Sequence, residues 1–313
     1  MKKKHKFLIL LILIAFFCII DKEFYNDLKT SVKEAFLGEN ITSDKEPSKQ
    51  VVGVNKVINE DLVVYFLDVG QADSILIKSN NEYMLIDAGN NEDGKNLVEY
   101  LKALGITKFK YVVGTHAHED HIGGMDDVID NFDIGTFYMP DVVTTTKTFE
   151  DVLDSLENKK IYFDTPKVDS TITLGNSKIK VLHVGDDESD LNNTSIVLKL
   201  NYNNVSFLFT GDATSEVEKL VLDKDIQSTV LKVSHHGSKY SSVASFLKKV
   251  NPTYAVITCG DENEYGHPHD VVLQKLEKLN AKIYRTNELG TIIVSSDGEN
   301  INFTSVKTNI DGN

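Results

Sequence analysis

The feature of this chain that most constrains its fold is a dense group of histidines and acids in the stretch Thr115–Gly124, which reads THAHEDHIGG. An apolar run at 111–113 precedes the group and a glycine pair follows it, which predicts a strand, a loop and the start of a helix. Three histidines and two acids fall within this loop: His116, His118, Glu119, Asp120 and His121. Imidazole and carboxylate are ligands that Zn²⁺ and related divalent ions prefer. The H-x-H-x-D-H spacing therefore predicts ligands for two adjacent metal ions.

Further ligand-type side chains follow other predicted strands: Asp87, Asp212, His235 and His236. Ligand sites form at the carboxyl ends of strands in sheets with helical crossovers, so we expect these residues to meet the histidine loop. Asp212 is predicted to bridge two ions, which such carboxylates hold about 3.5–4 Å apart. Of the adjacent histidines, His235 is favoured as the ligand because it follows the approach of the strand. Asp87 is a turn acid, a helix cap, or an outer residue that orients a ligand histidine.

Strands and helices alternate along the body of the chain, and several strands read as fully buried. The predicted strands are 62–68, 74–78, 83–87, 111–113, 135–139, 171–174, 178–182, 195–201, 205–210, 229–233 and 254–258, with three more near Ile283, Ile292 and Ile301. The predicted helices are 97–104, 124–131, 149–156, 215–222, 242–250 and 270–279. Two sheets with helices outside them satisfy this order. The fold class is therefore α/β, as a four-layer αβ/βα sandwich.

The first sixty residues differ from the body. Four lysines precede an uncharged apolar run at 7–20, which predicts that residues 1–20 are a signal peptide or an N-terminal membrane anchor. Residues 21–60 are predicted to form an amphipathic helix and a polar linker, 61–307 the folded domain, and 308–313 a tail. The lysines would stay cytoplasmic. We expect a bacterial protein whose body is secreted or anchored at the extracellular face of the membrane. Cys259 is alone in that body, so neither a disulfide nor a cysteine-based zinc site is expected.

The charge of the chain constrains its partners. The net charge is −14, and the first twenty residues hold four of the 33 basic residues and no acid. The rest therefore carries 29 basic against 47 acidic residues, a net charge of −18. A protein that grips a long polyanion usually shows a basic stripe, and this sequence has none. Tight nucleic-acid binding is disfavoured, although bound metal ions would offset some of the charge locally.

Seven motifs occur in a fixed order over about residues 61 to 305: 66–74 (FLDVGQADS), 86–89 (IDAG), 116–124 (HAHEDHIGG), 193–198 (NTSIVL), 209–212 (FTGD), 235–238 (HHGS) and 265–268 (YGHP). In these motifs the chain resembles the metallo-β-lactamase superfamily and, within it, the extracellular hydrolase-like domain of the ComEC competence proteins. The resemblance implies a first metal held by His116 and His118. It implies a second metal held by Asp120, His121 and one HHGS histidine, with Asp212 between the two.

One departure from the superfamily pattern concerns the first metal. The superfamily usually places another histidine between the first motif and the bridging aspartate. Here Asn192-Asn193-Thr194 occupies that region, as is common in ComEC-like members. His183 lies nearby, but the strand alternation makes it equally a packed residue. The implied cofactor is two divalent ions, Zn or Mn, with the first site short of one imidazole.

The resemblance implies a hydrolase of phosphodiesters, with the nucleic-acid backbone as substrate and Asp120 or a water carrying protons. Asp87, Asn193, His236 and His267 are expected to contact either the metal ligands or the substrate. Arg285 is expected in a surface ion pair rather than on a phosphate. Two alternatives remain: an esterase acting on surface phosphorylcholine, and a metal-binding surface protein without catalysis. The expected partners are the phosphodiester substrate, with DNA as a candidate, and the membrane through the N-terminal segment; no protein partner can be inferred.

Overall fold

The computed structural model describes residues 60–187, 189–308 and 310–311. By its contacts the chain divides into two units, Met1–Val57 and Ile58–Asn313, and all the described residues belong to the second. The predicted membrane segment at 1–20 and nearly all of the predicted helix and linker at 21–60 lie outside the described residues. Within the described ranges no helix has the length and apolar character needed to cross a bilayer.

The first sheet has eight strands in the order β15-β14-β1-β2-β3-β4-β5-β6. Its strands are β1 (Leu62–Phe66), β2 (Ile75–Ser79), β3 (Glu82–Ile86), β4 (Lys108–Val113), β5 (Asp133–Tyr138), β6 (Phe163–Asp164), β14 (Thr291–Ser296) and β15 (Ile301–Val306). Strands β3 to β6 run parallel, and the others pair antiparallel. The predicted hairpin between β2 and β3 is confirmed, with Asn80 at φ 56°, a conformation that asparagine tolerates.

The second sheet has seven strands in the order β13-β12-β11-β10-β9-β8-β7. Its strands are β7 (Thr171–Leu174), β8 (Ser177–His183), β9 (Val197–Tyr202), β10 (Val205–Phe209), β11 (Val230–Lys232), β12 (Tyr254–Ile257) and β13 (Lys282–Arg285). Strands β10 to β13 run parallel, while β7 to β10 pair antiparallel. Each sheet thus has a parallel half, and those halves carry the crossover helices.

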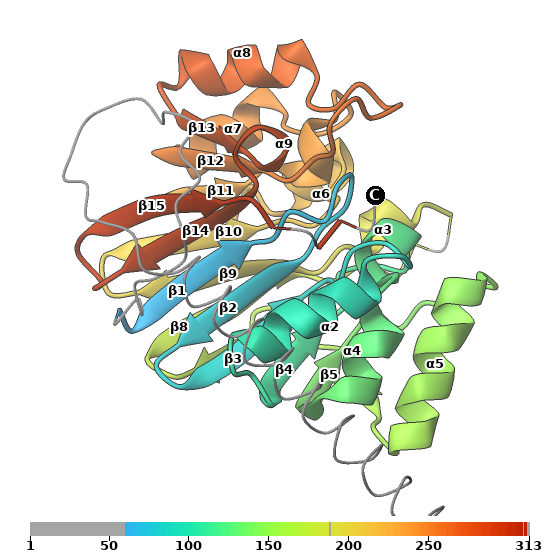
Figure 1. The fold of residues 1–313 in the computed structure, drawn as a ribbon. Coiled ribbons are helices and arrows are strands. Elements are labelled where there is room, and N and C mark those ends of the chain that lie inside the picture. Colours follow the sequence, from blue (N-terminus) through green and yellow to red (C-terminus); the bar gives the residue numbers. More distant parts are fainter. Residues whose placement is uncertain (1–59, 188, 309, 312–313) are drawn as a thin grey trace, which may run out of the picture. The chain divides into compact units, whose positions relative to one another are not determined.

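Three apolar clusters separate four layers. Side chains from β1 and β10, among them Phe66 and Phe209, fill the space between the two sheets. A second cluster joins the first sheet to its helices, and a third joins the second sheet to the others. The helices are α2 (Gly94–Ala103), α3 (Glu119–Ile122), α4 (Met125–Asn131), α5 (Lys147–Lys159), α6 (Ser215–Leu220), α7 (Ala244–Val250), α8 (Asp270–Lys278) and α9 (Thr286–Leu289). Figure 1 shows α2, α4 and α5 on one side and α7 and α8 on the other. The four-layer αβ/βα sandwich is confirmed.

The structure extends the body beyond its predicted end at 307. Ile310 is buried in the cluster beneath the first sheet, and its carbonyl accepts a hydrogen bond from Asn96 Nδ2 at 3.4 Å. The hydroxyls of Thr308 and Thr291 are 2.9 Å apart. The last described residues therefore pack against the domain.

The carboxyl ends of the parallel strands position the residues predicted to carry chemistry. In the first sheet, Asp87 follows β3 and the histidine loop follows β4. In the second sheet, Asp212 follows β10 and the 3₁₀ turn η2 (Ser234–Gly237) follows β11. Side chains from both sheets therefore converge at one end of the sandwich.

Candidate metal centre

Four side chains converge into a compact group of potential ligands: Asp120, His121, Asp212 and His236. One donor atom from each lies within 4.8 Å of the others. His121 Nε2 is 3.3 Å from Asp212 Oδ1, and His236 Nε2 is 3.5 Å from the same oxygen. Asp120 Oδ2 is 3.4 Å from His236 Nε2 and 3.7 Å from His121 Nε2. Two imidazoles and two carboxylates are a donor set suited to a divalent metal such as zinc.

The hydrogen-bond inventory of this group tests whether it fits a metal. His121 Nε2, His236 Nε2 and Asp212 Oδ1 are all buried, and none of them has a hydrogen-bond partner of good geometry. Buried polar atoms in folded proteins are almost always paired, because desolvation without a partner is costly. A metal ion would coordinate these three unpaired atoms, which belong to a group whose ligand atoms lie within 4.8 Å of one another. The residues present therefore fit a divalent ion at this position.

The outer side of His121 is fixed by a carboxylate. Its Nδ1 lies 2.9 Å from Asp87 Oδ2, and Thr115 holds Asp87 in turn with a backbone N–H and a hydroxyl, each at 2.7 Å. An Nδ1–H donated to Asp87 leaves the Nε2 lone pair for the metal. Of the three roles left open for Asp87, this contact fits the residue that orients a ligand histidine.

His236 is fixed in the same tautomer by a different acceptor. Its Nδ1 lies 2.9 Å from the carbonyl oxygen of Thr258, which follows β12. A carbonyl can only accept, so Nδ1 carries the proton and Nε2 is left as the ligand atom. The structure thus brings His236, and not the favoured His235, into the group with Asp120 and Asp212.

A second set of ligand-type atoms, from Asp73, Asp87 and His121, also lies within 4.8 Å of one another. Its members already have partners. Asp73 pairs with Lys232 Nζ at 2.8 Å, and Asp87 accepts from Thr115 and His121. Because these side chains are already paired with other protein groups, the set orients the ligands of the metal group and does not form a second ion site.

The two histidines expected at the first metal lie next to each other. His116 is buried, and its Nε2 is 3.0 Å from His118 Nδ1. Burial holds the pKa of His116 well below its ordinary value, so the imidazole is neutral and its lone pair is available. In the described part of the chain, no third histidine, cysteine, aspartate or glutamate joins this pair into a group of ligands.

The backbone around the site adopts uncommon conformations. His235 and His236 both have φ of 51°, and Asp87 has φ of 59°. Residues other than glycine and asparagine seldom adopt the left-handed region, which costs about 1–2 kcal/mol each. His235 Nε2 approaches the other oxygen of Asp212, Oδ2, at 3.5 Å, and its side chain is 23 % exposed. In the described part of the chain, eight further residues other than glycine also have positive φ; at the site this conformation shapes the turn that carries both histidines.

The remaining predicted site residues lie around this group. His267 stacks with His236, with ring centroids 6.3 Å apart, and its Nδ1 is 3.3 Å from Gln71 Nε2. Asn193 donates to Asp187 at 3.0 Å and accepts from the hydroxyl of Thr214, two residues after Asp212. It therefore anchors the loop beside Asp212.

Two residues weighed in the sequence analysis have partners of their own. His183 Nδ1 lies 2.9 Å from the carbonyl of Ser195, which fits the alternative of a packed residue. Arg285 forms an ion pair with Glu288 at 2.9 Å, as expected for a surface ion pair.

Three structurally important residues were not singled out in advance. Asp73 and Lys232 form a fully buried ion pair behind the site. The carboxylate of Glu218 accepts from Ser234 Oγ and from the backbone N–H groups of Ser242 and Val243, and so holds both ends of the segment that carries His235 and His236. One sequence feature could have pointed to such residues: a charged side chain inside or beside an apolar run, as in the segment 230–233 (VLKV).

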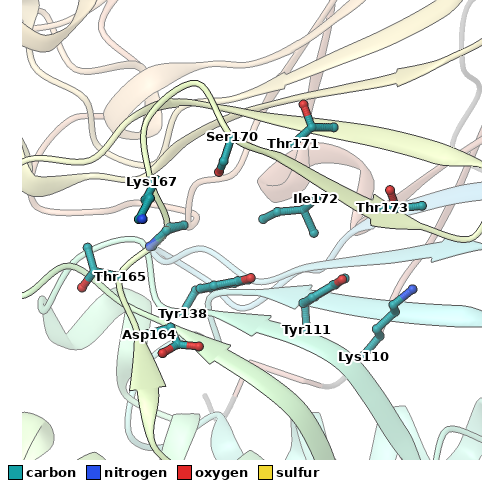
Figure 2. Close-up of a pocket in the computed structure, with 11 residues that line it drawn as sticks. Lys110, Tyr111, Tyr138, Asp164, Thr165, Lys167, Ser170, Thr171, Ile172 and Thr173 are labelled. Atoms are coloured by element: carbon teal, nitrogen blue, oxygen red, sulfur yellow. The ribbon is translucent and has the colours of Figure 1, made fainter.

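A cavity of about 620 Å³ lies elsewhere, between β4, β5 and β6 of the first sheet and β7 of the second (Figure 2). The rings of Tyr111 and Tyr138 line it and stack with centroids 5.8 Å apart. Lys110, Lys167 and Asp164 add charged groups. None of the predicted metal ligands lines this cavity. The candidate metal site is therefore separate from it, at the group around Asp212.

Metal binding is expected to release protons and to weaken as the pH falls. Burial lowers the pKa of His121, but the carboxylates of Asp212, Asp120 and Asp87 outweigh it and raise this pKa well above its ordinary value. The pKa of His236 is raised too, because Asp212 and Asp73 outweigh burial. Both imidazoles therefore keep a second proton to higher pH than an ordinary histidine does, and a metal must displace that proton.

Calorimetry of Zn²⁺ binding in buffers of different ionisation enthalpy, from about pH 6 to about pH 8, measures this exchange. The affinity should rise with pH across that window, and protons should be released throughout it. An affinity independent of pH, without proton release, would contradict the proposed ligand set.

The sequence profile of the metallo-beta-lactamase superfamily matches residues 67–261, more than half of the chain. The chain belongs to the metallo-beta-lactamase superfamily, and the group around Asp212 contains its candidate metal-binding residues. In broad class, the chain is therefore a hydrolase of that superfamily.

Its similar relatives are proteins of the ComEC family, which confirms the resemblance. ComE operon protein 3 of Bacillus subtilis is 29 % identical over 250 residues, which cover 73 % of this chain and 32 % of that protein. Competence protein ComA of Neisseria gonorrhoeae is 27 % identical, covering 75 % and 32 %. Recombination protein 2 of Haemophilus influenzae is 25 % identical, covering 77 % and 30 %. The chain spans about a third of the length of these relatives.

Solved structures show the same fold at low identity. The diiron β-hydroxylase CmlA of Streptomyces venezuelae superposes with a TM-score of 0.51 at 13 % identity, covering 72 % of this chain and 53 % of that one. The metallo-beta-lactamase fold protein YhfI of Bacillus subtilis gives a TM-score of 0.50 at 11 % identity, covering 78 % and 100 %. These likenesses support the architecture.

Proposed function

We propose that this chain is an exported, metal-dependent phosphodiesterase whose leading substrate is the nucleic-acid backbone. The observation that carries the proposal is the largely buried group of Asp120, His121, Asp212 and His236, whose ligand atoms lie within 4.8 Å of one another and in which His121 Nε2, His236 Nε2 and Asp212 Oδ1 lack hydrogen-bond partners. Divalent ions bound there would activate a water and neutralise charge on the phosphoryl oxygens. A bridging carboxylate and two neighbouring ions are the parts that two-metal phosphoryl-transfer sites use.

The residues in and around the donor set suit binding of a metal and of a substrate. The side chain of Asp120 is 31 % exposed, so substrate and solvent can reach it. Burial raises the pKa of Asp120, but the neighbouring His121 and His236 outweigh it and lower this pKa, so the carboxylate stays ionised and available to a metal ion. Burial and the neighbouring histidines lower the pKa of His267 to about 4. At neutral pH it is an uncharged group that can contact a substrate without repelling a metal.

Two observations bear on the substrate. Among the relatives, one is named a competence protein and another a recombination protein, which supports nucleic acid. The net charge of −18 outside the first twenty residues opposes tight binding of a polyanion and favours a cationic headgroup. Phosphorylcholine on a surface polymer is therefore the second candidate. The incomplete first site supports the third, a metal-binding protein without turnover.

Parallel assays of the full chain distinguish the three candidates. The chain is incubated with Mn²⁺ or Zn²⁺ and offered single-stranded DNA, double-stranded DNA or a choline phosphodiester, while metal content is measured on the same sample. We expect cleavage of DNA that a chelator abolishes. Cleavage of the choline ester alone supports the second candidate, and metal binding without either cleavage supports the third. Absence of bound metal would contradict all of them.

Export and membrane attachment belong to the same proposal. The lysine cluster and the apolar run at 7–20 support an extracellular body that is anchored or released. Protease treatment of intact bacterial cells should degrade the body of an anchored chain, and a released chain should be found in the medium. Protection in intact cells, with degradation only after lysis, would contradict an extracellular location.

A further inference from the structure

A lysine that is fully buried lies behind the candidate metal group. Lys232 is the last residue of β11, and none of its surface is exposed. Its Nζ is 2.8 Å from Asp73 Oδ2 and donates to the carbonyl of Val233 at 3.1 Å. Taking both charges out of water is costly, and such a pair often contributes little net stability. Its presence calls for a role other than holding the fold together.

The second oxygen of Asp73 faces the outer edge of His236. Asp73 Oδ1 accepts a hydrogen bond from the hydroxyl of Thr258 and lies 3.6 Å from His236 Nδ1. The carbonyl of the same threonine accepts the Nδ1 proton at 2.9 Å. Asp73 and Thr258 therefore act on the one face of His236 that must be a donor if Nε2 is to bind a metal.

Asp73 connects the two halves of the site, through its backbone to the loops of the first sheet and through its side chain to the second sheet. Its N–H donates to the carbonyl of Asp120 at 3.0 Å, and its carbonyl accepts from Gly89 at 2.9 Å. Asp73 belongs to the loop after β1 of the first sheet, whereas Lys232 and Thr258 belong to the second sheet. The ion pair thus connects the sheet that carries Asp120 and His121 to the sheet that carries His236.

We infer that Lys232 and Asp73 are positioning residues for the metal group around Asp212. Asp73 orients His236 through its negative charge and through Thr258. Lys232 occupies the other oxygen of Asp73, which keeps that carboxylate behind the histidine and prevents it from acting as a competing ligand. The inference rests on the proposed metal centre, and it concerns binding of the metal rather than the identity of the substrate.

Titration of the full chain with Co²⁺ tests the inference, because cobalt reports both affinity and ligand geometry by its visible absorption. The double variant Asp73→Asn/Lys232→Met removes both charges and so leaves no single buried charge unpaired. We expect it to bind cobalt about 10- to 100-fold more weakly, with an altered spectrum. The control is Lys199→Met/Asp225→Asn, which removes another ion pair, 2.8 Å apart, between β9 and the exposed Asp225 of the segment before β11, and should leave cobalt binding unchanged.

Far-ultraviolet circular dichroism checks that each variant folds. If the double variant does not fold, Thr258→Val supplies the test, because it removes only the hydroxyl that reaches Asp73 and keeps the carbonyl that holds His236. It should weaken cobalt binding and alter the spectrum in the same direction. Wild-type affinity and spectrum in the folded double variant, or in Thr258→Val, would overturn the inference. So would a wild-type chain that binds no cobalt. A chain that binds cobalt as expected but cleaves no phosphodiester leaves it standing and removes only the proposed function.

Discussion

Asp212→Asn is expected to lower metal-dependent hydrolysis by about three orders of magnitude, or about 4 kcal/mol of transition-state stabilisation. Asp212 Oδ1 faces His121 and His236, while Oδ2 faces His235. An amide of the same shape keeps the packing but loses the negative charge. Its NH₂ group would also donate to a histidine Nε2 and so occupy a lone pair intended for the metal.

The number of metal ions bound should fall in Asp212→Asn together with the rate. Metal analysis of the purified variant and its turnover of a chromogenic phosphodiester measure the two effects separately. The matched control is Asp130→Asn, the same substitution at an exposed position of α4, which should change neither quantity. If the Asp212 variant kept its metal and more than about a tenth of its rate, Asp212 would not bridge the site.

The layered fold could be predicted because local pattern and long-range packing agree. In β1, Val63 and Tyr65 pack toward the helices while Val64 and Phe66 pack toward the other sheet. A strand buried on both faces reads as an unbroken apolar run, and this is how it was recognised. The elements that were missed are short, such as β6 (Phe163–Asp164), because two residues carry no periodicity.

The histidine loop could be predicted because its ligands are close in sequence. The choice between His235 and His236 could not be settled in that way. An argument from strand direction assumes that β11 continues its extended path, but the chain enters a turn in which both histidines have positive φ. That turn directs His236 into the group with Asp120, and only the tertiary structure shows it.

The support behind the ligands was the hardest part to predict. Asp73, in the loop after β1 of the first sheet, and Lys232, in β11 of the second, are 159 residues apart, so neither spacing nor alternation connects them. Asp87 was easier, since an acid directly after a strand next to the histidine strand has few other places to point. Local sequence thus points to candidate ligands that are close in sequence, whereas the groups that fix their tautomers depend on how the two sheets meet.

His236→Ala and His235→Ala are expected to separate a ligand from its neighbour. His236 is 1 % exposed, its Nδ1 is held by Thr258, and its Nε2 faces two carboxylates. Losing a ligand should weaken metal binding by at least about 100-fold and lower the rate by about three orders of magnitude. His235 is partly exposed and Asp212 is the one carboxylate with which it forms an ion pair in the described part of the chain, so its loss should lower the rate about tenfold and leave metal affinity nearly unchanged.

Each of these two variants is the control for the other. Both positions have φ of 51°, so alanine meets the same backbone conformation at each, and thermal unfolding of both variants shows whether the loss of the buried His236 side chain also lowers stability. Metal affinity from competition with a chelator and turnover of a phosphodiester, measured side by side, give the comparison. A larger loss of affinity in His235→Ala would reverse the assignment and return His235 to the ligand role. Equal losses would mean that the two imidazoles serve different ions on the two oxygens of Asp212, and the missing imidazole of the first site would then be His235.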